Sequence, residues 1–474
     1  MAVHLVIIVA IGARVLMKRR PPGSSAAWLL SVVLLPYAGA VLYLFIGERP
    51  LGKRRARKAL EMRGQVERWV ATLAERSRDA PTPMSARWSS IRRLADGAVG
   101  LPVLGGNRFQ LLDGAELILR SLIDDVDAAR HFCLLEFYIW NPGGTADEVG
   151  EALIRAVARG VKCRVLLDAV GSKDFLRSRW PERFRDAGVE LHSALPASAL
   201  RAAFRRVDLR LHRKIAVIDG HVAYTGSLNL VDPRCFKQGA GVGEWVDAMA
   251  RIKGPAVEAL AGLFAWDWAM ESGAPLAELI EQIDVPMQIT EGAAEVQMVP
   301  SGPGYEGNGI MQVLLSAVYA AREELILTTP YFVPDESLVA ALQAAAQRGV
   351  KVRLIVPARV DSFLVRHASR AYFSDLLRAG VEILQFDAGL LHTKSVVVDR
   401  ELALFGTLNL DLRSFLLNFE VTLIVYDATF AETVAALAAG YAERAKPLNL
   451  QAWDRRPISQ RLTDNLVQIM SPLL

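Results

Sequence analysis

Two apolar segments stand at the start of the chain. Residues 26–46 carry no charge and are long enough to cross about 30 Å of hydrocarbon as one helix. A buried helix of that length in a soluble protein normally keeps a polar face, so this segment predicts a transmembrane helix. Residues 1–17 are also apolar but shorter, and Arg14 interrupts them, which indicates a short or tilted first span. Positive charges follow this run and no small-residue cleavage site separates the segments, so we expect a retained segment rather than a cleaved signal peptide.

From about residue 100 the chain repeats one pattern twice. In each copy an apolar strand is followed by a loop, an amphipathic helix, an Arg-Gly-Val-Lys turn and a second apolar strand. The copies read LLEFYIWNPGGTADEVGEALIRAVARGVKCRVLLDAVGS and LILTTPYFVPDESLVAALQAAAQRGVKVRLIVPARVDS. Each copy predicts a βαβ unit with parallel strands. One duplication, offset by about 180 to 190 residues, explains both copies.

These patterns divide the chain into four regions. We expect a membrane anchor of one or two transmembrane helices over residues 1–47 and a basic, helical linker over residues 48–99. One α/β domain should cover residues 100–285 and a second residues 286–474.

Composition and charge agree with a membrane-bound protein. Apolar residues make up 52% of the chain, which is high for a soluble protein. The net charge of +4 fits an anionic partner but does not distinguish lipid from nucleic acid. Basic residues cluster at 18–20 and, more densely, at 53–58, which weakly favours a cytoplasmic position for the second cluster. The three cysteines are scattered and odd in number, so neither a disulfide framework nor a zinc site is expected.

The strongest chemical signal is a motif that occurs once in each copy. The chain reads HRKIAVIDGHVAYTGSLNL from His212 and HTKSVVVDRELALFGTLNL from His392. Both segments share the pattern H-x-K-x4-D-x6-G-[ST]-x-N. A lone His-x-Lys is more often part of a half-exposed strand. Two copies with the same downstream residues instead favour a functional site.

Strand periodicity explains the spacing within the motif. Residues two apart project from the same face of a strand, so the His and Lys of each copy point together, as do the Ser or Thr and the Asn. Folding each copy into a hairpin about its centre gives four expected pairs: His212 with Asn229, Lys214 with Ser227, His392 with Asn409, and Lys394 with Thr407. Such a face suits a phosphate, so Ser227, Asn229, Thr407 and Asn409 are the expected phosphate-binding residues.

The motif aspartates have a different expected role. Asp219 and Asp399 lie at odd separation from their histidines, at the strand end just before the bend. We therefore expect them to support the turn as part of the catalytic motif, without touching the substrate phosphorus.

Two such sets of side chains, one from each motif, are suited to cleave a phosphodiester bond. One neutral imidazole attacks phosphorus while the other, protonated, gives its proton to the departing alkoxide. The lysines and the Ser, Thr and Asn groups stabilise the charge on the nonbridging oxygens. No carboxylate cluster accompanies the motif, so we expect catalysis without a metal ion or other cofactor.

An attacking imidazole needs an acceptor on its second nitrogen. Aligning the repeats places Asp247 opposite Glu420, each on an apolar strand downstream of the histidine in its own copy. These two acids are the expected orienting residues. An ordinary buried or edge carboxylate remains the alternative interpretation.

The motifs resemble those of the phospholipase D superfamily. Together with the N-terminal apolar segments, the stretches LGKRRARK, EFYIWNPGG, YTGSLNLVDPR, TTPYFVPDE, GLLHTKSVVVD and GTLNLDLRSFLLNFE resemble bacterial cardiolipin synthases over nearly the whole chain. The resemblance implies an α/β fold, with two pseudo-symmetric phospholipase D-like αβα sandwich domains that share one active site, preceded by N-terminal transmembrane helices. It places the protein in the bacterial inner membrane, with the catalytic domains on the cytoplasmic side.

The resemblance also implies an activity. Two phosphatidylglycerols would condense to cardiolipin, with release of glycerol, through a phosphatidyl-histidine intermediate. The nucleophile would be His212, and His392 would act first as acid and then as base, although the pseudo-symmetry permits the reverse. The implied partners are phosphatidylglycerol, cardiolipin and the lipid bilayer, with no nucleic acid.

Three alternatives remain. A lipid hydrolase or another phosphatidyltransferase would share every catalytic residue. A nuclease of the same superfamily is favoured slightly by the basic stretch at residues 201–213. A membrane scaffold with an inactive fold is disfavoured because both motif copies are intact.

Overall fold

The computed structural model describes residues 2–17, 22–43, 53–77, 86–196, 208–283, 290–305 and 308–470. Two expectations lie wholly or mostly outside the described residues. They concern the basic cluster at 18–20 and the basic stretch at 201–213, of which residues 201–207 are not described.

The strands follow the two copies of the repeat. Those of the first half are β1 (Val103–Asp113), β2 (Phe132–Phe137), β3 (Lys162–Asp168), β4 (Glu190–Ala194), β5 (Arg210–Leu211), β6 (Lys214–Ile218), β7 (Val222–Gly226), β8 (Trp245–Val246) and β9 (Ala248–Lys253). Those of the second half are β10 (Ala294–Ser301), β11 (Glu324–Thr328), β12 (Phe332–Val333), β13 (Lys351–Pro357), β14 (Glu382–Phe386), β15 (Leu390–Leu391), β16 (Ser395–Val398), β17 (Leu402–Gly406), β18 (Leu410–Asp411), β19 (Asn418–Val425) and β20 (Ala445–Pro447).

The helices also fall into two sets. The first set is α4 (Lys53–Ser77), η2 (Ala86–Trp88), α5 (Ser89–Val99), α6 (Ala115–Ala128), α7 (Thr145–Ala158), α8 (Lys173–Arg177), α9 (Trp180–Ala187), η3 (Gln238–Ala240), α11 (Ala256–Ser272) and α12 (Leu276–Ile283). The second set is α13 (Gly309–Ala320), α14 (Glu336–Gln347), α15 (Phe363–Arg378), α16 (Leu412–Leu416), α17 (Ala428–Glu443), α18 (Leu450–Asp454) and α19 (Ile458–Met470).

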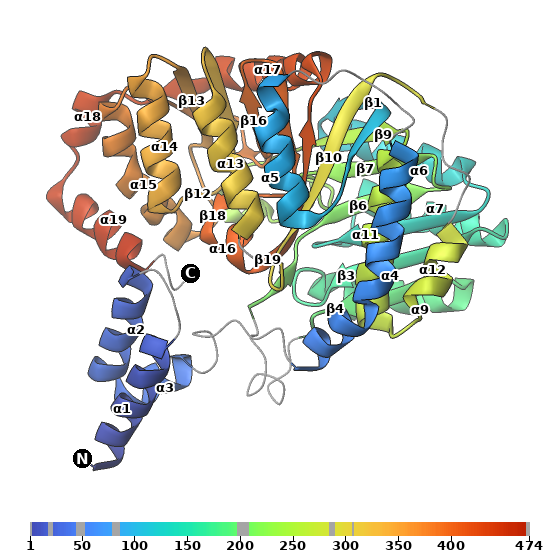
Figure 1. The fold of residues 1–474 in the computed structure, drawn as a ribbon, viewed down its shortest axis with the longest axis horizontal. Coiled ribbons are helices and arrows are strands. Elements are labelled where there is room, and N and C mark those ends of the chain that lie inside the picture. Colours follow the sequence, from blue (N-terminus) through green and yellow to red (C-terminus); the bar gives the residue numbers. More distant parts are fainter. Residues whose placement is uncertain are drawn as a thin grey trace.

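A single sheet runs through both halves (Figure 1). The first half has the order β1-β9-β7-β6-β2-β3-β4, and the second has β10-β19-β17-β16-β11-β13-β14-β20. The two orders correspond strand by strand until β20 adds an edge, which is what a duplication predicts. At the junction β1 and β10 are antiparallel neighbours. In each half the predicted βαβ unit is confirmed, because β2 pairs with β3, and β11 with β13, in parallel.

Alternate side chains of the strands face two different helical layers. On β2, Cys133 and Leu135 pack with α6 and α7, whereas Leu134 belongs to the core that α11 covers. On β16, Val396 packs with α13 and α14, whereas Val397 faces α17. This alternation is the period of two that strands impose, and it gives the αβα layering expected for each half.

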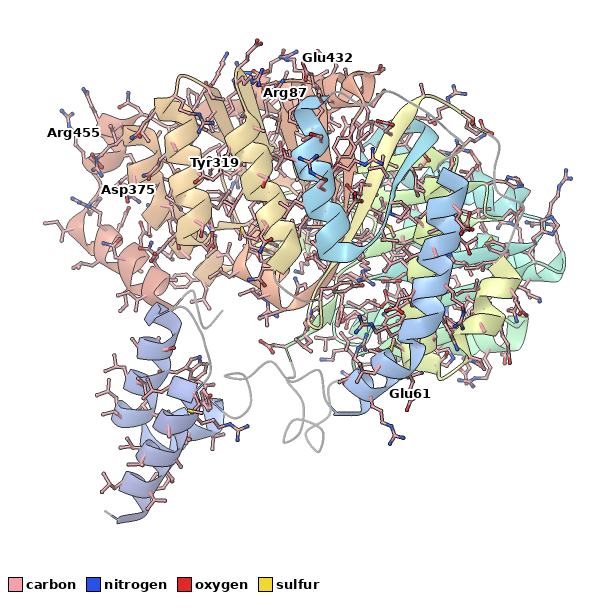
Figure 2. All side chains as sticks on the ribbon, viewed as in Figure 1. Glu61, Arg87, Tyr319, Asp375, Glu432 and Arg455 are labelled. Atoms are coloured by element: carbon pink, nitrogen blue, oxygen red, sulfur yellow. The ribbon has the colours of Figure 1, made fainter. Side chains whose placement is uncertain are left out.

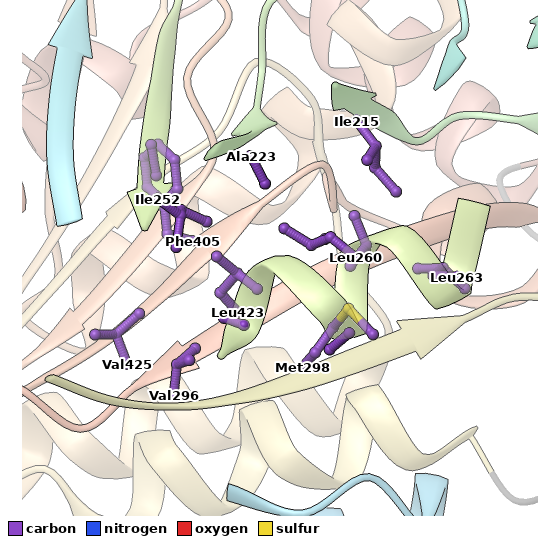
Figure 3. Close-up of a cluster of buried hydrophobic side chains, with 14 of the residues drawn as sticks. Ile215, Ala223, Ile252, Leu260, Leu263, Val296, Met298, Phe405, Leu423 and Val425 are labelled. Atoms are coloured by element: carbon purple, nitrogen blue, oxygen red, sulfur yellow. The ribbon is translucent and has the colours of Figure 1, made fainter. Parts of the chain in front are cut away.

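The hydrophobic core is continuous across the junction of the halves. Figure 3 shows Ile252 of β9 and Leu260 of α11 close to Val296 and Met298 of β10 and Leu423 of β19. All five side chains are at most 3% exposed. The two halves therefore share buried apolar surface as well as a strand pair.

The region between the anchor and the first half is more than a linker. Helix α4 packs on α11, where Trp69 lies against Gly262 and Leu73 is fully buried. Helix α5 packs on α13 through Ile91 and Ala95. Each helix buries one apolar face, as an amphipathic sequence does in a globular protein.

The N-terminal segments form three helices: α1 (Ala2–Met17), α2 (Pro22–Leu34) and α3 (Pro36–Leu42). The expectation of one continuous helix over residues 26–46 is wrong. The helix ends at Leu34, because the ring of Pro36 removes a backbone donor and restricts Leu35, which has φ −126° and ψ 72°. In the described part of the chain, no helix has both the length and the apolar character needed to cross a membrane.

Candidate active site

Each motif histidine lies next to a strand that pairs with the opposite half. His212 follows β5, which runs parallel to the start of β19, and its backbone N–H donates to Phe419 O at 2.9 Å. His392 follows β15, which runs parallel to β8, and its N–H donates to Val246 O at 2.8 Å. The two short parallel pairs thus carry each histidine onto the other half of the molecule.

This exchange decides which carboxylate each imidazole contacts. His212 Nδ1 lies 2.8 Å from Glu420 Oε2, and His392 Nδ1 lies 2.7 Å from Asp247 Oδ1. Both carboxylates are fully buried. The two acids expected as orienting residues therefore do contact the motif histidines. Each contacts the histidine of the opposite copy, although the sequence placed it downstream of its own.

The motif hydroxyls lie behind these carboxylates. Ser227 Oγ donates to Asp247 Oδ1 at 2.6 Å, and Thr407 Oγ1 donates to Glu420 Oε2 at 2.6 Å. Each hydroxyl oxygen also accepts a backbone N–H, so it is used as both donor and acceptor. Phosphate binding by Ser227 or Thr407 would need one of these bonds to be exchanged, and it stays a prediction.

The motif lysines are buried beside the histidines. Lys214 Nζ donates to His212 O at 2.6 Å, and Lys394 Nζ donates to His392 O. Lys214 Nζ also lies 5.5 Å from the centroid of the Tyr138 ring. Both ammonium groups are therefore held next to an imidazole, where a phosphate oxygen could meet them.

The motif asparagines carry unused hydrogen-bonding atoms. Asn229 Oδ1 accepts the backbone N–H of Ile139 at 3.1 Å. Its amide nitrogen and the side-chain oxygen of Asn409 are buried without a partner among the described residues. Buried amides are normally satisfied, so these two side chains are suited to a polar substrate.

The motif aspartates support the turns, as expected from their spacing. Asp219 accepts the backbone N–H groups of Arg130, His131 and Phe132 at 2.7 to 2.9 Å. Asp399 accepts three consecutive N–H groups, those of residues 322–324, at 2.7 to 2.9 Å, and it pairs with Arg87, labelled in Figure 2. Burial acts to raise the pKa of Asp399, but these hydrogen bonds hold it below its usual value.

The predicted register of the motif hairpins is wrong by one residue. In the first copy Ile215 faces Thr225 and Ile218 faces Val222, so residues 219–221 form a three-residue turn. In the second copy Ser395 faces Phe405 and Val398 faces Leu402. A fold about the exact centre of each segment needs a two-residue turn. The aspartate at the first turn position is instead drawn out of the ladder, with positive φ, by its bonds to the neighbouring strand start.

Burial sets the protonation of the imidazoles. It lowers the pKa of His212 to about 4, against the effect of Glu420, and Lys214 adds to the lowering. It lowers the pKa of His392 to about 4 as well, assisted by Lys394. Burial would raise the pKa of the two carboxylates, but their imidazole partners keep it below the usual values. At neutral pH each neutral imidazole therefore donates Nδ1–H to an ionised carboxylate and keeps Nε2 free.

The two lysines belong to one electrostatic environment. Burial lowers the pKa of Lys214 to about 8, and it lowers that of Lys394 well below its usual value. The charge of Lys214 adds to the lowering at Lys394, and the charge of Lys394 acts on His212. The two motif copies are thus close enough in space to act on a common anion.

Two aromatic residues of the site were not predicted. The Tyr138 ring centroid lies 4.9 Å from that of His212, and the Trp245 centroid lies 4.3 Å from that of His392. Trp245 precedes the orienting Asp247 by two positions, and Tyr138 follows β2 directly. For Tyr138 the available signal was its position directly after an apolar strand, and for Trp245 it was its closeness in sequence to Asp247.

In the described part of the chain, a cluster of buried charged side chains lies next to His212 and Glu420, and no such cluster lies next to His392 and Asp247. Arg213, the variable residue of the first motif, donates from Nε to Glu420 O at 3.0 Å and pairs with Asp267. Fully buried Glu136 accepts no N–H or O–H group of the described residues, and its carboxyl lies beside that of Asp267. Burial, and then the charge of Asp267, raise the pKa of Glu136 well above its usual value. The second motif has Thr393 in place of Arg213.

Comparison with known proteins gives consistent matches. Residues 122–268 and 314–439 match the family model described as "Cardiolipin synthase, PLD-like domain", and residues 5–48 match "Phospholipase_D-nuclease N-terminal". Cardiolipin synthase A of Yersinia pseudotuberculosis serotype O:1b is 46% identical over 471 residues, covering 99% of this chain and 97% of the relative. Cardiolipin synthase A of Salmonella arizonae is 46% identical over 472 residues, with the same coverage.

A solved structure shares the fold. Phosphatidylserine synthase from Haemophilus influenzae superposes with a TM-score of 0.61 at 17% identity, over 81% of this chain and 100% of that chain. The family model covers more than half of the chain, and the relatives match it almost from end to end. The chain therefore belongs to the cardiolipin synthase family of PLD-like proteins.

Proposed function

We propose that this protein is a cardiolipin synthase that transfers a phosphatidyl group between two phosphatidylglycerol molecules. The products would be cardiolipin and glycerol. Relatives named cardiolipin synthase A over almost the whole chain support the proposal. The observation that carries the proposal is the pair of buried imidazoles. His212 is hydrogen-bonded to Glu420 and His392 to Asp247, so each ring is oriented by a carboxylate of the opposite half.

The first step would form a covalent intermediate. His212 Nε2 attacks the phosphorus of one phosphatidylglycerol and forms a P–N bond, while the P–O bond to the headgroup glycerol breaks. His392, protonated at Nε2, gives that proton to the departing alkoxide, and free glycerol leaves. The bound phosphodiester anion favours this protonation, because its negative charge opposes the lowering by Lys394.

The second step would reverse these roles. The hydroxyl of a second phosphatidylglycerol gives its proton to His392 Nε2 and attacks phosphorus, so the P–N bond breaks and cardiolipin forms. Transfer to a hydroxyl requires that water be kept out. The burial of both histidines, 7% and 2% exposed, supports this requirement.

Residues around the phosphorus would stabilise the developing charge. We assign the nonbridging oxygens to the ammonium groups of Lys214 and Lys394 and to the amide nitrogens of Asn229 and Asn409, because only these atoms can donate to an oxygen. Ser227 and Thr407 would act mainly by fixing the orienting carboxylates. No step requires a metal ion, because the two buried lysines supply the positive charge.

The assignment of His212 as nucleophile is supported by an asymmetry. Arg213 ties the backbone of Glu420 to the buried pair with Asp267, which holds the orienting acid of His212 in place. Among the described residues, the corresponding Thr393 bonds to two neutral groups, Val246 O and the Tyr441 hydroxyl. A more rigid imidazole suits attack along a fixed line.

We also propose that helices α1 to α3 attach the protein to the bacterial inner membrane, with the catalytic halves on the cytoplasmic side. The proposed division is an anchor at 1–47, helices at 48–99, and PLD-like domains at 100–285 and 286–474. Support comes from the apolar side chains that these helices leave at least 44% exposed: Leu5, Val6, Val9, Leu16, Met17, Leu30, Val33, Leu34, Leu35, Tyr37, Val41 and Leu42.

Product analysis tests the proposed activity. Purified protein given phosphatidylglycerol vesicles should form cardiolipin and free glycerol in equal amounts. Phosphatidic acid as the main product would instead identify a lipid hydrolase, and cleavage of DNA without lipid turnover would identify a nuclease. His212→Ala and His392→Ala should each abolish turnover, and substantial activity in either variant would contradict the shared site.

A further inference from the structure

Exposed apolar side chains gather at one place on the globular part of the protein. Beyond residue 100 in the described chain, eight large apolar side chains are at least 36% exposed. Two of them, Leu117 and Tyr319, are isolated. The other six lie on α19 and at the start of α15: Phe363, Leu364, Ile458, Leu462, Leu466 and Ile469. Such a concentration is unusual for a monomeric surface.

The apolar residues of α19 form one stripe. Ile458, Leu462, Leu466 and Ile469 are 63% to 73% exposed. At about 100° per residue they fall within about 80° of the helix circumference. The opposite face, with Asp464 and Val467, is buried against α15. The most apolar face of this helix therefore points away from the protein.

Buried polar contacts fix this orientation. Asp464 is 1% exposed, and its carboxylate accepts from His367 Nδ1 at 2.6 Å and from Arg456 at 2.7 Å. Arg370 Nε lies 3.3 Å from the same carboxylate. A surface helix of a soluble protein normally buries its apolar stripe and exposes its polar face. Here the arrangement is reversed and held by ion pairs, so the stripe is available to another apolar phase.

The charged residues around the stripe indicate which apolar partner it contacts. Arg461 on α19 is exposed, as are Arg455, labelled in Figure 2, which follows α18, and Arg366 on the neighbouring helix α15. Between residues 455 and 470 the only acidic side chain is Asp464, which is buried. A stripe of large apolar residues with flanking arginines has the chemistry of a helix that lies in the headgroup region of an anionic bilayer.

The position of α19 agrees with this partner. In the view of Figure 1, α19 and the N-terminal helices α1 to α3 all lie at the lower left of the molecule. A second copy of the chain is a poorer partner, because symmetric pairing of two such faces would bring arginines together.

We infer that the face formed by the α19 stripe, Phe363 and Leu364 is a second membrane contact, which lies in the surface of an anionic bilayer. It acts in addition to the N-terminal helices. Because α19 packs on α15, which contacts β12, this contact would hold the catalytic half at a fixed height and tilt over its lipid substrate. The inference concerns docking and does not depend on the proposed reaction.

Site-directed fluorescence tests the inference. The full chain is prepared with Cys235→Ser, which removes the exposed cysteine and leaves buried Cys133 and Cys163. A single cysteine at Leu462 or Leu466 carries an environment-sensitive fluorophore, and the protein is reconstituted in phosphatidylglycerol–phosphatidylcholine vesicles that contain a lipid-borne quencher. The matched control is a cysteine at Leu117, a 51% exposed leucine on α6 in the other half.

We expect a blue-shifted emission at 462 and 466, and quenching at least about threefold stronger than at 117. Equal quenching at all three positions would overturn the inference. A blue shift that appears in detergent without vesicles and grows with protein concentration would also overturn it, because it would identify a second copy as the partner.

An activity measurement separates docking from catalysis. Leu462→Asn with Leu466→Asn should lower turnover on phosphatidylglycerol vesicles but leave turnover on detergent-dispersed short-chain lipid unchanged, with Leu117→Asn as control. Equal loss on both substrates would contradict a docking role. Failure of the proposed reaction would instead appear as absence of cardiolipin in the unsubstituted protein, while the fluorescence result stands by itself.

Discussion

At the scale of single residues, each reactive imidazole depends on a carboxylate from the opposite half. Glu420→Gln removes the ionised acceptor of His212, and Asp247→Asn removes that of His392. Loss of such an acceptor disturbs the tautomer and direction of the ring, so we expect turnover to fall by about 10²- to 10⁴-fold in each variant.

The two variants should affect the two steps differently. With radiolabelled phosphatidylglycerol, Glu420→Gln should chiefly slow the labelling of His212 and the glycerol release coupled to it. Asp247→Asn should slow this first step and also the later loss of label, because His392 is the acid of one step and the base of the other. Thr407→Val, which removes the hydroxyl that bonds to Glu420 and to the backbone of Val421 but keeps the carboxylate itself, provides a milder control. If Glu420→Gln leaves the labelling of His212 unchanged and slows only the loss of label, the contact between Glu420 and His212 across the halves is contradicted.

Buried Glu136 should make stability depend on pH. Burial raises its pKa well above the ordinary value of 4.5, so the folded protein holds a proton that the unfolded chain releases near neutral pH. The free energy of unfolding therefore falls as the pH rises from about 4.5 toward the pKa of Glu136 in the folded protein, by about 1.4 kcal/mol for each pH unit. A glutamine at this position does not titrate, so the stability of the Glu136→Gln variant does not depend on this proton.

Thermal unfolding at several pH values tests this expectation. Glu136→Gln should unfold at a higher temperature than the unsubstituted protein at pH 8, and the difference should vanish near pH 4. Glu151→Gln, at a half-buried acid whose pKa its partner Arg183 lowers, should lack this pattern. A difference that is constant from pH 4 to pH 8 would mean that Glu136 is not the group that binds the proton.

The residue types of the site could be predicted from the sequence, but their partners could not. The duplicated motif identified the histidines, lysines and asparagines, and repeat alignment identified both acids. The contact between His212 and Glu420 joins positions 208 residues apart, and it follows from the parallel pairing of β5 with β19. A two-residue strand leaves no periodic signal, so the exchange between halves was not visible.

At the scale of elements, the motif hairpins are held by close backbone contacts. A Cβ atom on Gly226, at the end of β7, would lie 2.5 Å from Ala248 O and 2.8 Å from Met249 Cα on β9. Gly226→Ala should therefore push β7 away from β9 and move Ser227 from Asp247. We expect a loss of about 1 to 3 kcal/mol in the free energy of unfolding and a strong loss of turnover.

Unfolding in denaturant and turnover at saturating substrate measure these two effects. The control is Gly440→Ala within α17, where an added Cβ meets nothing within 4 Å. Alanine is the better helix former, so this variant should be as stable as the unsubstituted protein or more stable. Unchanged stability in Gly226→Ala would show that β7 and β9 can separate without cost.

The sequence predicted elements well where the periodicity was long. The two βαβ units, each with its amphipathic helix, follow directly from the pattern. Two local details overrode it. Pro36 divides an apolar run that hydropathy treats as continuous, and the bonds of Asp219 to a neighbouring strand lengthen the hairpin turn by one residue. Both effects depend on backbone hydrogen bonds that apolar patterning does not report.

At the scale of the whole molecule, the two halves should unfold as one unit. They share the antiparallel pair of β1 with β10, one continuous core and both histidine–carboxylate contacts. Phe430 of α17 is 3% exposed and lies in this core, with its ring centroid 4.8 Å from that of Phe109 on β1. Phe430→Ala removes a large side chain at the junction, which should cost about 3 to 5 kcal/mol.

Hydrogen exchange can show whether this loss is shared. If the halves unfold together, Phe430→Ala should speed exchange of the slowest amides by the same factor in β2 and β3 of the first half as in β11 and β13 of the second. Thr433→Ala, on the exposed side of the same helix, should leave all four strands unchanged. Faster exchange in β11 and β13 alone would mean that the halves are independent units. In that case the contacts that join each histidine to the opposite half would position the site without stabilising the fold.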